Sequence, residues 1–211
     1  MMDFEVGAMN ALKEEVPSVK IKGCHFHYSQ SIWRKVQELG LVSHYINTAE
    51  IRQFIRRLMA MPFVPLGQVD EAFFISVAEV TWTAPITDLI SYFTDTWLEE
   101  EALFTVDIWN HFSTDDNIRT NNNVEGWHSK LQKSGMSPKP NVYIFVNKMK
   151  EIEEENIAER RMLLCGSENP PQQKAVYKKV NDRLYSLKQR LLNQTISLRA
   201  YMDATTYIVK K

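Results

Sequence analysis

The sequence predicts a mainly α-helical globular protein with one short strand near residues 18–24. Apolar residues recur at three- and four-residue spacing through most of the 211 residues, as they do in helices that bury one face. Pro and Gly residues interrupt these runs where helices would end. Only near 18–24 do apolar and polar residues alternate as in a strand. Hydrophobic residues make up 44% of the chain, which is enough for a packed core.

The N-terminal elements are a helix followed by this strand. Asp3 is a natural N-cap for the helix. We expect the helix to end near Val16, because the residue before a proline is disfavoured in the α conformation. The run Val19-Lys20-Ile21-Lys22 then alternates and leads into Gly23. The apolar face of the helix comprises Phe4, Ala8, Met9, Ala11 and Leu12.

Four further helices are predicted between residues 31 and 100. Apolar residues at helical spacing cover 32–39, 51–58, 69–77 and 86–97. Gly40 is a suitable stop for the first of these helices. The second would end before Pro62, and Pro85 suits the first turn of the fourth.

The chain becomes polar and turn-like from 109 to 123 and then turns helical again. A helix that carries Glu125 ends at 134–135. We expect a long helix over about 142–164, a basic helix over about 172–193 and a last helix over about 196–209.

Charge, cysteine content and missing motifs exclude several classes of protein. The net charge is −1, so no overall basic field indicates a nucleic-acid partner. Two cysteines are too few for a disulfide framework and favour a reducing compartment. We expect no signal peptide and no membrane span, because no apolar run is long enough for either. Glycine-rich phosphate loops, hydrolase triads and zinc-protease motifs are missing from the sequence.

Three short patches contain the residues that could support chemistry. They are Asp3, the run Gly23-Cys24-His25-Phe26-His27, and the run 119–128 around Glu125. Carboxylates that converge from separate elements can hold the two divalent metals that cut phosphodiester bonds. Taken singly, Asp3 is more simply a helix cap and Glu125 a surface acid. Only their order along the chain, together with the residues around them, favours a shared functional role.

In this order the patches resemble the Mutator-like element (MULE) transposases, whose ribonuclease H-like domain carries an Asp-Asp-Glu triad. The resemblance implies that Asp3 is the second and Glu125 the third catalytic acid, and that both bind Mg²⁺ or Mn²⁺. The helices between them would be the all-helical insertion of that family. The first acid would precede residue 1. The chain would then be a C-terminal fragment of the α/β fold, inactive on DNA by itself and holding no metal stably.

The same resemblance implies partners and a location. Transposon-end DNA would be the substrate and the nucleus the location. A second copy of the chain or the missing N-terminal half would be the protein partner. The implied divisions are a ribonuclease H-like remnant at 1–30, a helical insertion at 31–117, the acid-bearing helix at 118–136 and a helical region at 137–211.

Four other residues are candidate accessory groups of the site. On a helix, Asn122 and His128 share one polar face with Glu125, which suits either a metal site or a solvated surface. Cys24 and His27 have the spacing of half a zinc site, but a second pair is missing. Core packing is their simpler role. By the resemblance they shape the active site or contact substrate.

The predicted basic helix supports an alternative function. Between 174 and 199 there are seven Lys or Arg residues and one acid, Asp182. A domesticated helical module could use this helix to bind DNA or an acidic partner without catalysis, although such a run is also typical of a solvated face. The candidate DNA contacts are Lys174, Lys178, Lys179, Arg183, Lys188 and Arg190.

Overall fold

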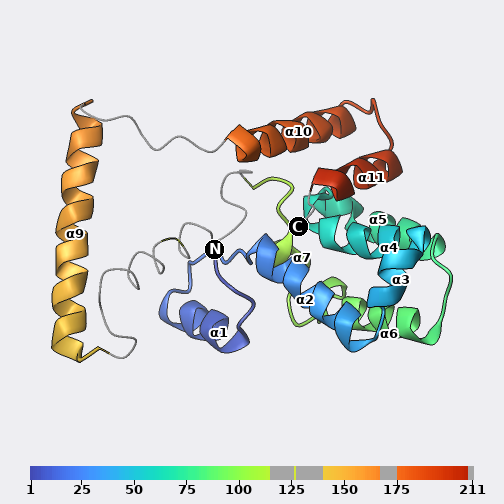
Figure 1. Cartoon of the computed structure of the whole chain (residues 1–211), viewed down its shortest axis with the longest axis horizontal. Coiled ribbons are helices and arrows are strands. Elements are labelled where there is room, and N and C mark those ends of the chain that lie inside the picture. Colours follow the sequence, from blue (N-terminus) through green and yellow to red (C-terminus); the bar gives the residue numbers. More distant parts are fainter. Residues whose placement is uncertain (115–125, 127–139, 167–174, 209–211) are drawn as a thin grey trace. The chain divides into compact units, whose positions relative to one another are not determined.

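The computed structural model describes residues 1–114, 126, 140–166 and 175–208, and these residues are mainly helical, as predicted. The chain divides into two compact units, one of residues 1–121 with 179–211 and one of residues 122–178. The described helices are labelled in Figure 1. None of the described helices is both long and apolar enough to span a membrane. The elements are α1 (Val6–Glu15), α2 (His25–Glu38), α3 (Val42–Asn47), α4 (Ala49–Ala60), the 3₁₀ turns η1 (Met61–Phe63) and η2 (Leu66–Gln68), α5 (Val69–Ala78), α6 (Ala84–Phe93), the π-helical turn η3 (Thr94–Leu98), α7 (Val106–Trp109), α9 (Val142–Leu164), α10 (Ala175–Leu192) and α11 (Leu198–Ile208).

Most of the predicted helices are confirmed at their predicted ends. Helix α1 ends before Val16, and the chain leaves α2 through Gly40 with φ +69°. The helices predicted at 51–58, 69–77, 86–97 and 142–164 correspond to α4, α5, α6 with η3, and α9. The short helices α3 and α7 were not predicted, because they are too short to show a helical period.

Two predictions for the N-terminus are wrong. The segment near 18–24 is not a strand: it forms a single parallel β-bridge, between Met2 and Gly23. The pairing stops there because the chain enters α2 at His25. Asp3 is not the cap of α1; Glu5 precedes the helix without a side-chain capping bond, and the carboxylate of Asp3 contacts His27.

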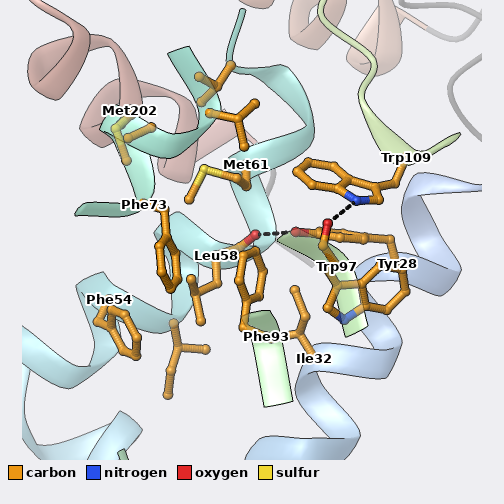
Figure 2. Packing of buried hydrophobic residues seen from close by; sticks show 14 of the residues in the cluster. Tyr28, Ile32, Phe54, Leu58, Met61, Phe73, Phe93, Trp97, Trp109 and Met202 are labelled. Atoms are coloured by element: carbon orange, nitrogen blue, oxygen red, sulfur yellow. Dashed lines mark hydrogen bonds between the residues drawn. The ribbon is translucent and has the colours of Figure 1, made fainter. Parts of the chain in front are cut away.

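The core of the first unit surrounds α4, which packs against α2, α3, α5 and α11. Its buried face of Ile51, Phe54, Ile55 and Leu58 joins an aromatic cluster from α2 and the 97–109 region (Figure 2). The ring of Tyr28 lies 4.8 Å from Trp97 and 5.3 Å from Trp109 between ring centroids. The Trp109 indole donates a hydrogen bond to the Trp97 carbonyl at 2.7 Å.

The C-terminal end of α4 is buried, so its carbonyl groups need hydrogen-bond donors from elsewhere. Pro62 has no N–H and cannot serve Leu58, four residues before it. The Leu58 carbonyl accepts instead from the backbone amide of Met61 and from the Tyr28 hydroxyl, the latter at 2.9 Å (Figure 2). The next three carbonyl groups accept hydrogen bonds from other segments. The His111 amide donates to the Pro62 carbonyl at 2.6 Å, the Tyr201 hydroxyl to the Phe63 carbonyl at 2.5 Å, and the Asn110 side-chain amide to the Val64 carbonyl at 2.8 Å.

A buried arginine joins three elements beside this segment. Arg57 on α4 is 3% exposed, and its guanidinium lies 2.7 Å from Glu79, just after α5, and 2.7 Å from Asp203 on α11. Gln53 also donates to Asp203 at 2.7 Å. Arg57 is buried, whereas Glu79 and Asp203 are each about a third exposed, so removing both carboxylates would leave a buried unpaired charge. The network therefore fixes α11 against α4.

Removing either buried phenol should destabilise the protein. Tyr28→Phe and Tyr201→Phe each leave a buried carbonyl with one donor fewer, and we expect each to lower the free energy of unfolding by about 1–3 kcal/mol. Urea denaturation followed by circular dichroism would measure this. The control is Tyr185→Phe, at a side chain that is 62% exposed, which should change stability by less than about 0.5 kcal/mol. Equal effects in all three variants would contradict a stabilising role for the hydrogen bonds from Tyr28 and Tyr201 to buried carbonyl groups.

Tyr28 should also make the protein sensitive to high pH. Burial, and secondarily the nearby Tyr92, raise the pKa of Tyr28 well above its ordinary value of 10.0. The unfolded chain therefore loses this proton at a lower pH than the folded chain. The contribution to stability is complete below about pH 10 and is lost as pH rises through the folded pKa, at up to about 1.4 kcal/mol per pH unit. Unfolding measured against pH should show the stability difference between wild type and Tyr28→Phe shrinking above about pH 10; a constant difference would contradict it.

Candidate active site

In the N-terminal corner, residues 1–5 and 19–27, two extended segments meet in one parallel β-bridge and are connected by α1. The Met2 amide donates to the Lys22 carbonyl at 2.9 Å, and the Cys24 amide donates to the Met2 carbonyl at 2.9 Å. Helix α1 is the crossover between the two extended segments, as a parallel pairing requires. Asp3 follows the first segment directly, and α2 begins directly after the second. The corner thus brings two of the predicted patches together.

Gly23 holds the two segments in place through close contacts. A Cβ at this position would lie 2.1 Å from the ring of Phe4. That ring is itself packed edge-on against Trp97 and Phe104, with centroids 4.8 and 4.9 Å away. The Gly23 amide donates to the Ile108 carbonyl at 2.8 Å. The position therefore favours glycine, since a Cβ here would displace the Phe4 ring from its contacts with Trp97 and Phe104.

Two residues that the sequence did not indicate also fix the corner. Buried His111 lies with Nε2 2.9 Å from the Gly23 carbonyl; a carbonyl only accepts, so Nε2 carries the proton. The Lys22 ammonium donates to the carbonyls of Asp107 and Asn110 at 2.5 and 3.0 Å. Burial lowers the pKa of Lys22, and the charge of Asp107 partly offsets this. No local pattern marks either residue, because both act over more than 80 positions in sequence.

Asp3 and His27 form the polar contact of the corner. The imidazole Nδ1 lies 2.8 Å from Asp3 Oδ1, with the two side chains 23% and 52% exposed, respectively. Phe26 packs edge-to-face against the imidazole at 5.2 Å. A pair this exposed contributes only about 0–1 kcal/mol to stability. The contact places the carboxylate of Asp3 beside the first turn of α2.

The rest of the Cys-x-x-His patch is structural. Cys24 is fully buried at the N-cap of α2, which agrees with the core-packing interpretation. His25 is also buried, with Nε2 3.2 Å from the Met59 carbonyl and 3.3 Å from the Ser29 hydroxyl. Among the residues that the structure describes, no three His, Cys, Asp or Glu side chains are grouped to hold a metal ion. His27 of this patch reaches the predicted catalytic acid, Asp3.

The other predicted site residues fall into two groups. Glu125, Asn122, His128 and Lys174 lie outside the described residues. Of the basic candidates on α10, Lys178, Lys179, Arg183 and Arg190 are exposed. The prediction of a DNA contact by Lys188 is wrong, because its side chain is buried. Its ammonium lies 5.7 Å from the Phe112 ring centroid and 3.5 Å from the His111 carbonyl.

Comparison with known proteins finds no matching family model, no matching curated protein and no matching solved structure.

Two glycine substitutions test the corner. Gly23→Ala forces a methyl group against the Phe4 ring, and we expect it to lower the free energy of unfolding by about 1–3 kcal/mol. Gly7→Ala is the matched control: it lies in α1, and its Cβ would meet no atom within 4 Å. It should be neutral or stabilising by up to about 1 kcal/mol. Thermal unfolding of both variants would measure the difference. If Gly23→Ala were as stable as Gly7→Ala, a Cβ at residue 23 would not collide with the Phe4 ring, and this prediction would be contradicted.

Proposed function

We propose that this chain corresponds to the C-terminal part of a MULE-type transposase domain, derived from a metal-dependent enzyme that cuts and joins DNA strands. One observation supports the proposal above the others. Asp3 lies at the carboxyl end of the first segment of a parallel pair and contacts the His of the Cys-x-x-His patch. In open α/β sheets, ligands bind at the carboxyl ends of the strands. The position of Asp3 directly after the first of two segments joined by one parallel β-bridge supports the proposal.

The described residues do not amount to a complete metal site. Mg²⁺ is usually bound by one or two carboxylates together with substrate phosphates, and a two-metal reaction needs acids from several elements. Here Asp3 supplies one carboxylate, with Oδ1 2.8 Å from His27 Nδ1. Glu125, the other proposed acid, lies outside the described residues. We derive no catalytic step from this arrangement and expect the chain to bind neither Mg²⁺ nor Mn²⁺ stably by itself.

The proposal assigns different roles to Asp3, His27 and Cys24. Asp3 would be a catalytic acid, and His27 a positioning residue that fixes the direction of its carboxylate. Cys24 would act only by anchoring the start of α2 to the Met2 carbonyl through its amide. DNA as the substrate and the nucleus as the location belong to the same proposal and rest on the resemblance.

The proposal requires Glu125 to approach Asp3, and a spin label can test this. We would attach a nitroxide at residue 125 in a Glu125→Cys, Cys165→Ser variant; the remaining Cys24 is fully buried. Paramagnetic broadening falls off steeply with distance. The backbone amides of Asp3 and His27 should therefore broaden more than those of the distant core.

The matched control carries the label on α6, at Asp88→Cys, an exposed position within the proposed insertion. This label should leave the amides of Asp3 and His27 sharp. If the label at 125 broadened them no more than the label at 88, the two acids would not converge. The transposase proposal would then be overturned.

A further inference from the structure

The rotation of α10 about its own axis is fixed by packing. Leu184, Lys188 and Leu191 are buried at spacings of four and three residues, which place them on one face. The opposite part of the helix is therefore exposed. Lys179, Arg183 and Arg190 lie there at i, i+4 and i+11, so they form one stripe at about 100° per residue. Exposed Ser186 lies in the same stripe, between Arg183 and Arg190.

The positive charges of this stripe are not neutralised within the described part of the chain. The ion pairs there involve other cations, among them Arg57, Arg199 and Lys35. The acid on α10, Asp182, is exposed and lies one turn from Lys179, but it is about 80–100° around the helix from Arg190 and Arg183. Three cations on one rigid helix thus face solvent together, which concentrates positive potential in a protein of net charge −1.

The geometry favours nucleic acid over other anionic partners. A membrane-bound amphipathic helix needs its apolar face for insertion, and here that face is packed into the core. The three cations are fixed at rises of about 6 and 10 Å along a line of about 16 Å. A duplex strand presents one phosphate per about 3.4 Å of axis, so the stripe spans about five phosphates. Ser186 supplies a hydroxyl of the kind that often contacts phosphate oxygens.

We propose that the stripe Lys179, Arg183 and Arg190 of α10 is a contact surface for the phosphate backbone of duplex nucleic acid. Binding is independent of base sequence and salt-sensitive. Lys188 takes no part, because it is buried against Phe63 and Phe112. This inference does not rest on the transposase proposal, since it needs neither Asp3 nor Glu125.

Fluorescence anisotropy with a labelled duplex of mixed sequence would test the surface. Each phosphate contact contributes about −0.9 to the slope of log affinity against log salt. Three contacts predict a slope of about −2.7, or roughly a 40-fold loss of affinity between about 50 and 200 mM salt. Each single substitution, Lys179→Gln, Arg183→Gln or Arg190→Gln, should reduce the slope by about 0.9, and the triple variant should remove most of it.

The matched control removes three positive charges elsewhere: Lys13→Gln, Lys20→Gln and Arg34→Gln, all at exposed positions of the same unit. It should keep the wild-type slope. Circular dichroism and thermal unfolding would show that both triple variants stay folded. Equal losses in the two triple variants would overturn the proposal, as would competition by polyglutamate as strong as that by unlabelled duplex. Binding to phosphatidylserine vesicles at least as tight as to duplex would also overturn it.

Discussion

The structure of the first unit depends on one constraint: the last turn of α4 and the segment after it are buried, and their carbonyl groups must be satisfied. Pro62 removes the donor that a continuing helix would supply to Leu58. An unmet buried carbonyl costs about 1–3 kcal/mol. Side chains of α2, of the chain after α7 and of α11 therefore donate hydrogen bonds to these carbonyl groups: Tyr28, Asn110 and Tyr201. Tyr28 and Tyr201, which are far apart in sequence, come together because both donate hydrogen bonds to carbonyl groups of this short segment.

His111 extends this constraint to both candidate functional surfaces. Its backbone amide donates to Pro62, and its imidazole donates to the Gly23 carbonyl in the N-terminal corner. Its own carbonyl accepts from Lys188, on the buried face of α10. One residue thus links the core segment, the corner that carries Asp3 and the helix that carries the basic stripe. The corner is held by this network more than by its single β-bridge, because one bridge gives very little pairing energy.

The sequence predicted the parts of this fold that depend on local pattern. Amphipathic runs and their Gly or Pro stops were enough to predict α4 and α5, because burial repeats along such helices at a fixed period. Helix α9 was predicted from the prolines before it and Gly166 after it. The pairing of Asp3 with His27 was not predicted as a contact, although both residues were candidates. The burial of Arg57 and Lys188 was missed altogether. Both long side chains are buried only because carboxylates, carbonyls or rings from distant segments surround them, and no local pattern encodes such partners.

The two proposed activities make different demands on the same scaffold. Catalysis on a phosphodiester needs carboxylates that converge to within a few ångströms, so it depends on tertiary contacts that Asp3 alone cannot supply. Backbone binding needs only a rigid row of cations, which one packed helix such as α10 provides. The proposed binding surface needs neither Asp3 nor Glu125, so it does not depend on a metal site. A helical DNA-binding module and a transposase origin are therefore compatible, because the structural requirements of binding are a small part of those of cutting.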